Sequence, residues 1–210
     1  MFGRLNYAAA KHIRENGIWY LCFFILFSLG ISFGAFWVSK LSIDSKDLLI
    51  RYVEGFFNLI PGGTIYNGGT FRISFINNMI WIVMLFISGF TYLGAVVSPL
   101  YMTFKGFCFG FSVAFLVESF GRKGLIFSLI SLLPHSIVLI PGTIFLCTIS
   151  FQYSLFLLKS RNDKRYETKR QSFASYIVPF AFGLAAVILS SIIESYITPV
   201  FIRSLSVFII

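Results

Sequence analysis

The sequence predicts an all-α, polytopic membrane protein with about five transmembrane helices. Hydrophobic residues make up 57% of the 210 residues and charged residues only 12%, whereas a soluble globular domain carries about 25% charged residues. The apolar residues also lie in long uncharged runs, and about 20 such residues cross the hydrocarbon core of a bilayer. We therefore expect a single integral membrane domain over residues 1–210.

The charge pattern indicates orientation in a membrane. The formal net charge is +9, from 17 Lys and Arg against 8 Asp and Glu, and the basic residues gather at the ends of apolar runs and in residues 159–172. This placement favours a lipid bilayer as the partner and no nucleic acid. The cysteines lie inside apolar runs without CxxC spacing, so we expect neither a disulfide framework nor a metal site.

The expected spans cover about residues 18–38, 76–97, 100–120, 136–158 and 176–196. Gly30 and Gly34 in the first span are four residues apart, as are Gly106 and Gly110 in the third, so each pair lies on one helix face that a neighbouring backbone can approach closely. Residues 30–34 also match the Gly-x-Ser-x-Gly pattern of hydrolases. Because Ser32 would sit inside an apolar helix without a suitable Asp partner, we interpret these glycines as packing residues.

Residues 45–60 predict an amphipathic helix. Apolar side chains recur there at three- and four-residue spacing, with charged residues largely between them. Asp44 or Ser45 would cap its start, and Pro61 with the two following glycines would end it. We expect this helix on the outer surface of the membrane or folded over the bundle. Gly68 and Gly69 are interpreted as turn residues.

Two connections complete the expected topology. A tight turn at Ser98 and Pro99 would separate the second and third spans. Residues 125–158 carry no charge except at His135, and a straight helix of that length would measure about 51 Å against a hydrocarbon core of about 30 Å. We therefore expect Pro134 to break it and to leave 125–133 as an interfacial or re-entrant segment.

The positive-inside rule selects one orientation. With the amino terminus in the cytoplasm and the carboxyl terminus outside, the inner segments hold more basic residues over less loop length than the outer segments. The expected location is a bacterial cell membrane, crossed several times.

Ionisable residues within membrane spans are candidates for function, and four stand out: Lys105, Glu118, His135 and Glu194. We interpret Lys105, Glu118 and Glu194 as anchors near span ends, with Arg122, Lys123 or Arg203 as partners of the two glutamates. His135 is interpreted as a corner residue after Pro134. Pro141 and Pro199 complete the candidate packing or interaction residues. We expect no catalytic, cofactor-binding or metal-binding residues and no enzymatic activity.

Four segments in register carry a resemblance to a known family. They are LFSLGISFGAF at 26–36, KGFCFGFSVAFLVESFG at 105–121, SLLPHSIVLIPG at 131–142 and SSIIESYITPVF at 190–201. Together they resemble the stage II sporulation protein M (SpoIIM) family over essentially the whole chain. The resemblance implies a five-span, non-enzymatic scaffold of endospore-forming bacteria. It would recruit the cell-wall hydrolases SpoIIP and SpoIID, thin the septal peptidoglycan and support engulfment, in the septal or engulfing mother-cell membrane.

A small membrane permease or permease-like subunit is the alternative. A helix broken at Pro134 and Pro141, with His135 and Glu118 nearby, would line a cavity at the bilayer midplane as in transporters. No internal repeat is visible to support it. An intramembrane protease lacks a credible Ser–His pair. Either interpretation is compatible with a homo-oligomer.

Overall fold

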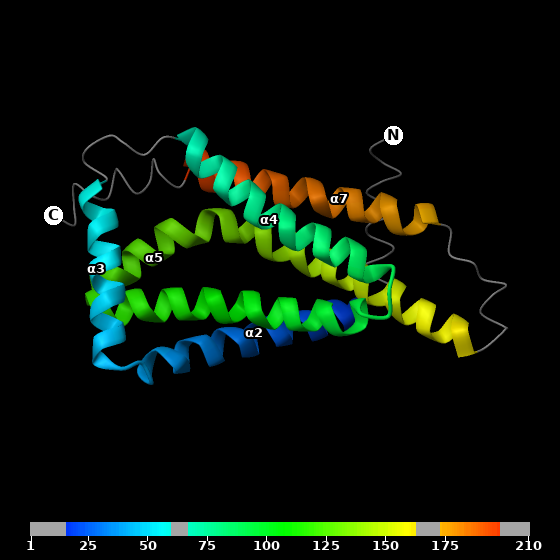
Figure 1. The fold of residues 1–210 in the computed structure, drawn as a ribbon, viewed down its shortest axis with the longest axis horizontal. Helices are drawn as coiled ribbons and strands as arrows, with labels where there is room; N and C mark the ends of the chain where they lie inside the picture. The colour runs from blue at the N-terminus through cyan, green and yellow to red at the C-terminus, as the bar shows by residue number, and fades with distance from the viewer. Residues whose placement is uncertain (1–15, 60–66, 163–172, 198–210) are drawn as a thin grey trace.

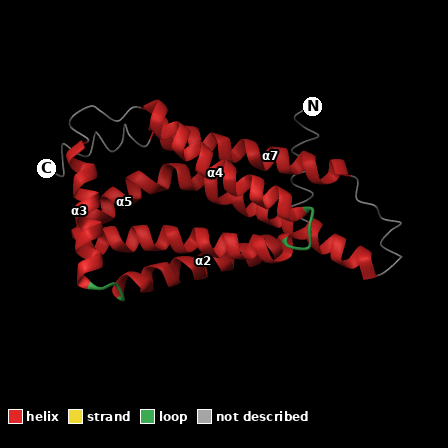
Figure 2. Ribbon diagram, viewed as in Figure 1, coloured by secondary structure: helices red, strands yellow, loops and turns green. Residues whose placement is uncertain are grey.

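Every regular element that the computed structural model describes is a helix, as expected of an all-α protein (Figures 1 and 2). The described residues are 16–59, 67–162 and 173–197, so residues 1–15, most of 159–172 and Pro199 lie outside them. The elements are α2 (Gly17–Ser39), α3 (Ile43–Leu59), α4 (Asn67–Gly89), α5 (Gly94–Asn162), α7 (Phe173–Ile192) and the π-helix η1 (Ile193–Ile197). Two described stretches, Gly17–Ser39 and Gly94–Ser160, are long and apolar enough to cross a membrane.

Helix α5 is a hairpin rather than one rod. Gly121 has φ 57° and ψ −132°, a backbone conformation that residues with a side chain rarely adopt, and the chain folds back there into two arms, residues 94–120 and 122–162 (Figure 1). The expected break at Pro134 is wrong. Gly121 is the residue with non-helical dihedrals within α5, so Pro134 and Pro141 stay inside the second arm.

The second arm is bent rather than interrupted (Figure 1). A proline in a helix removes one backbone hydrogen bond and kinks the helix, and neighbouring helices in a membrane protein can compensate for the lost bond. Residues 125–133 therefore belong to the long second arm and form no separate interfacial or re-entrant segment.

The turn between α4 and α5 lies earlier than expected. Helix α4 ends at Gly89 and α5 begins at Gly94, so Ser98 and Pro99 are helical and the expected turn there is wrong. Ser154 of the second arm holds this connection, because its hydroxyl donates to the Thr91 carbonyl at 2.8 Å and accepts from the Ala95 N–H at 3.0 Å. Helix α4 likewise begins at Asn67, which places Gly68 and Gly69 in its first turn rather than in a loop.

Helix α2 packs along the first arm of α5 with the two backbones in direct contact. A methyl group on Gly34 would overlap the Phe107 carbonyl oxygen, and one on Gly106 would overlap the carbonyl oxygen of Phe27. Gly30 and Gly110 are equally confined, by the backbones of residues 103–107 and of Ile31. The two glycine pairs thus face each other across one crossing, which we call the glycine crossing.

The other half of the bundle is held by aromatic rings. Phe86 and Phe90 of α4, Tyr153 of the second arm, and Tyr176 and Phe180 of α7 form a continuous cluster. The buried Tyr176 donates its hydroxyl to the Phe86 carbonyl at 3.0 Å. The second arm therefore lies between the α2 layer and the layer of α4 and α7 (Figure 1).

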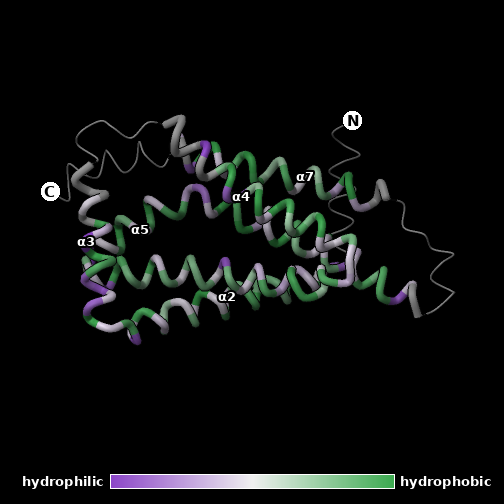
Figure 3. The backbone as a smooth tube through the Cα atoms, viewed as in Figure 1, coloured by the Kyte–Doolittle hydropathy of each residue, from purple (hydrophilic) through white to green (hydrophobic). Residues whose placement is uncertain are grey.

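The lengthwise helices present apolar side chains outward. Leu29, Phe33 and Ile80 are each more than half exposed, and hydrophobic residues dominate these helices whereas hydrophilic stretches gather on α3 (Figure 3). Such a surface suits lipid rather than water. The apolar helices therefore indicate a membrane protein.

We expect Gly34→Ala to destabilise the protein by about 1–3 kcal/mol, because the added methyl group meets backbone atoms of α5 that cannot rotate away. The free energy of unfolding in detergent micelles measures the effect. Gly55→Ala in α3 is the matched control, since a Cβ there has no atom within 4 Å, and it should be neutral or stabilising. Equal stability of the two variants would contradict the glycine crossing.

Candidate functional site

Helix α3 lies across one end of the bundle. Figure 1 shows it nearly perpendicular to the long helices, beside the end of α2 and the turn of the α5 hairpin. Only Lys40, Leu41 and Ser42 connect it to α2. The Ser42 hydroxyl accepts from the Ser45 N–H at 3.4 Å and so caps the helix. The cap is therefore Ser42 rather than Asp44 or Ser45.

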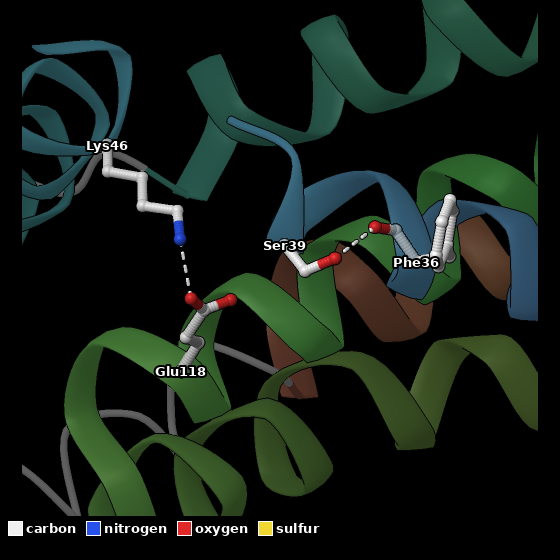
Figure 4. A network of polar contacts seen from close by, with 4 residues as sticks. All are labelled: Phe36, Ser39, Lys46 and Glu118. Carbon is white, nitrogen blue, oxygen red and sulfur yellow. Dashed lines mark hydrogen bonds and ion pairs between the residues drawn. The ribbon is translucent and has the colours of Figure 1, made fainter. Parts of the chain in front are cut away.

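An ion pair joins α3 to the first arm of α5. Lys46 Nζ lies 2.5 Å from Glu118 Oε1, across 72 residues of sequence, and Figure 4 shows the two side chains pointing toward each other. Nearby, the Ser39 hydroxyl donates to the Phe36 carbonyl at 2.8 Å in the last turn of α2. The sequence predicts a basic partner for Glu118 close in the chain or in the carboxyl-terminal tail, whereas the observed partner on α3 carries no sequence signal.

The Lys46–Glu118 pair positions α3 rather than stabilising the fold strongly. The Lys46 side chain is 26% exposed and that of Glu118 47% exposed, and ion pairs at such exposure contribute at most about 1 kcal/mol. Together with the short α2–α3 connection, the pair gives α3 two attachments to the bundle.

Apolar side chains of α3 point away from the rest of the described structure. Leu48 and Tyr52 are 69% and 79% exposed, and their four-residue spacing places them on one helix face. The charged residues Asp44, Asp47 and Arg51 are exposed around them. Helix α3 thus presents an apolar strip with a charged border.

A second feature is a groove between α2 and the two arms of α5, with a volume of about 180 Å³. Its polar lining comes from Lys105, Cys108 and Ser112 on the first arm and from His135, Ser136 and Thr143 on the second. Apolar walls come from Phe27, Phe109, Leu132, Leu139 and Ile140. The groove therefore combines both arms with the residue of α2 that packs on Gly106.

Lys105 lies deep in the bundle rather than near a helix end. Because α5 begins at Gly94, Lys105 is about 17 Å from that end and about 24 Å from Gly121 at 1.5 Å per residue. The interpretation of Lys105 as an interfacial anchor assumes a helix that starts near residue 100, whereas α5 begins eleven residues before Lys105. Its ammonium lies 5.8 Å from the ring centroid of Tyr101, a cation–π distance.

Three of the four ionisable candidates come together. Glu194 of η1 interacts electrostatically with both Lys105 and His135, and the Ser190 hydroxyl ties α7 to the second arm by donating to the His135 carbonyl at 3.0 Å. Glu118 is the exception, because it pairs with α3. Sequence reasoning singles out all four residues, but it places Lys105 and Glu194 on opposite sides of the membrane and therefore misses their convergence.

The remaining candidates have packing positions. Gly30, Gly34, Gly106 and Gly110 form the glycine crossing, Pro134 and Pro141 lie in the bent second arm, and Pro199 falls outside the described residues. Within the part of the chain that the structure describes, no group of three or more His, Cys, Asp or Glu side chains could hold a metal ion.

Comparison with known proteins shows the family of this chain. A family model described as stage II sporulation protein M matches residues 23–199, a region that contains the glycine crossing, the hairpin, the groove and Glu118. No curated protein and no solved structure matches the chain. The match covers well over half of the 210 residues, and with the apolar helices it indicates a sporulation-related membrane protein. The chain belongs to the stage II sporulation protein M family.

Proposed function

We propose that this protein is a non-enzymatic membrane scaffold in sporulation that recruits cell-wall hydrolases through α3. The observation that carries the proposal is the apolar strip of Leu48 and Tyr52 on a helix that the Lys46–Glu118 pair holds across the end of the bundle. A helix with one apolar face binds readily in a groove of a partner protein.

The attachment of α3 supports a docking role. The glycine crossing holds α2 against α5, the short connection from Lys40 to Ser42 determines where α3 begins, and Glu118 pairs with Lys46 in the first turn of α3. These attachments limit the orientations open to α3 and so lower part of the entropy cost of binding a partner. Tyrosine is enriched among the residues that dominate binding energy, and the exposed charges of Asp44, Asp47 and Arg51 would form the polar rim of the interface.

The family resemblance supplies the partners in this proposal, namely SpoIIP-like and SpoIID-like cell-wall hydrolases acting in peptidoglycan remodelling during septal thinning and engulfment. The proposed topology has about five spans, with the amino terminus cytoplasmic and the carboxyl terminus outside, in the septal or engulfing mother-cell membrane. The start of the basic segment 159–172 supports this topology. Lys159 and Arg161 belong to the last turn of α5, which ends on the side of the bundle opposite α3 (Figure 1), and basic residues favour the cytoplasmic side of a membrane.

A small permease or permease-like subunit is the second candidate, and the groove beside Lys105 and His135 favours it. Glu118, which the sequence places near such a cavity, has no part in it. Solute uptake by proteoliposomes that is lost in His135→Ala would support this candidate, and uptake equal to that of protein-free liposomes would reject it.

The double variant Leu48→Ala, Tyr52→Ala should weaken binding of a purified SpoIIP-like hydrolase about tenfold or more, since truncating a buried anchor typically costs over 1 kcal/mol. Binding to the detergent-solubilised protein is measured directly. Leu29→Ala with Phe33→Ala on the exposed face of α2 removes similar apolar area and should leave binding unchanged. Unaltered affinity in the α3 variant, or equal losses in both, would reject docking through α3.

A charge swap tests whether the ion pair positions α3. Lys46→Glu places two carboxylates together and should release the first turn of α3 from the bundle, with weaker hydrolase binding. Adding Glu118→Lys restores opposite charges at the same two positions and should recover binding. The affinity of each variant, measured at low and high salt, checks this. A double variant no better than Lys46→Glu alone would show that the pair has no positioning role.

A further inference from the structure

Lys105, His135 and Glu194 meet near the middle of the bundle. At 1.5 Å per residue, Lys105 is about 24 Å and His135 about 21 Å from the hairpin turn at Gly121, so the two arms bring them to a similar level. Glu194 reaches them from η1. These groups therefore lie far from both ends of the first arm, and an arm that spans a hydrocarbon core of about 30 Å would carry them inside the bilayer.

Ionisable groups at that depth are costly unless they pair directly or face water. Lys105 and Glu194, although they interact electrostatically, form no direct ion pair in the described structure. The groove beside Lys105 has a volume of about 180 Å³, and one water occupies about 30 Å³ in the liquid. The groove therefore has room for several waters or for one small solute.

The chemistry of the groove lining favours an anion. Among the side chains that line the groove, Lys105 carries a formal positive charge, and none is a carboxylate. The hydroxyls of Ser112 and Thr143 donate to backbone carbonyls of their own helix, those of Cys108 at 2.8 Å and Ile140 at 2.9 Å. Their oxygen lone pairs remain available to accept hydrogen bonds. The lining thus offers one cation beside acceptors for a ligand that carries its own O–H or N–H groups.

Glu194 lies near enough for its carboxylate to interact with Lys105, but it does not line the groove. It sits on a π-helix, a distortion that occurs often at functional sites. An anion that enters the groove would compete with Glu194 for the Lys105 ammonium, so the strength of binding should depend on both residues in opposite directions.

We propose that this groove is a hydrated binding site for an anionic phosphate or carboxylate group, held by Lys105 and contacted by His135. The group belongs either to a small solute or to the headgroup of an anionic lipid. Neither source depends on the scaffold role, because the groove and the exposed strip of α3 are separate surfaces.

Cys108 provides a natural probe, because it lines the groove and is exposed. In phosphatidylcholine nanodiscs, a charged, membrane-impermeant thiol reagent should modify Cys108, since thiolate formation requires water. Leu29→Cys is the matched control. Position 29 lies about 18 Å from the start of α2 on an exposed face, where lipid should prevent reaction of the introduced thiol. Mass spectrometry of the peptides that contain each cysteine measures the modification rate of each thiol separately. A Cys108 thiol no more reactive than the thiol introduced at position 29 would mean a dry groove and would overturn the proposal.

Ligand protection then tests the anion. Inorganic phosphate in the buffer, or phosphatidylglycerol added to the nanodiscs, should slow modification of Cys108 several-fold and leave other thiols unaffected. Protection by phosphate identifies a solute site, and protection by phosphatidylglycerol alone identifies a lipid headgroup site. Failure of both probes to protect would overturn the proposal.

Three variants test the roles of Lys105 and Glu194 in anion binding. Protection should disappear in Lys105→Met, persist in Lys105→Arg, and occur at lower ligand concentration in Glu194→Gln, because the competing carboxylate is gone. The Arg and Gln variants keep the test decisive if Lys105→Met fails to fold. Protection that is unchanged in Lys105→Met, or weakened in Glu194→Gln, would contradict the assigned roles. Hydrolase binding, measured on the same variants, should be unaffected.

Discussion

Direct contact between the backbones of α2 and the first arm of α5 is the constraint on which the other features depend. Lipid tails solvate apolar side chains well, so helices in a bilayer associate largely through close van der Waals packing and polar contacts. Glycines at positions 30, 34, 106 and 110 permit that packing here. The same crossing sets where α3 can lie, because only a short connection separates the end of α2 from the start of α3. It also forms one wall of the groove, since Phe27 both packs on Gly106 and lines the cavity.

The two halves of the bundle are held in different ways. On the α2 side, the helices are held by close backbone packing at glycines. On the α4 and α7 side, they are held by contacts between aromatic rings and by hydrogen bonds from polar side chains to neighbouring helices. Ser150 to Leu85 at 2.9 Å, Tyr176 to Phe86 at 3.0 Å and Asn78 to Ser191 at 3.2 Å are examples. The second arm of α5 belongs to both halves. The groove lies where that arm faces the glycine-packed half, and this explains how polar side chains find room inside an otherwise close-packed bundle.

Much of this arrangement is predictable from local sequence patterns. Uncharged runs locate the helices, four-residue glycine spacing locates the close crossing, and the amphipathic period locates α3 to within two residues of its start. The positions of the turns are not predictable in this way. Pro134 carries the stronger local signal, yet the chain reverses at Gly121, because a helix can bend at proline while a positive φ favours glycine.

Because the turn positions are predicted wrongly, the groove is not predicted either. The connection between α4 and α5 is held by hydrogen bonds to Ser154, about sixty residues away in sequence. No local sequence pattern predicts such long-range hydrogen bonds. A turn placed at Ser98 assigns Lys105 to the membrane surface. Moving the start of α5 back to Gly94 places Lys105 at depth, beside a histidine from the other arm. The partner of Glu118 is hidden for the same reason, since long-range pairs between helices leave no trace in a single sequence.

The bent second arm has a further consequence for the membrane around it. Its uncharged stretch from residue 125 to 158 would measure about 51 Å if straight, considerably more than the hydrocarbon thickness of an ordinary bilayer. Such an excess is relieved by tilting, by kinking or by local thickening of the lipid, and each has a small energetic cost for every ångström of mismatch. The bend in the proline-containing arm removes part of that excess. The excess that remains would have to be taken up by tilt of the arm or by thickening of the surrounding lipid, so bilayer thickness would enter the energy of this protein.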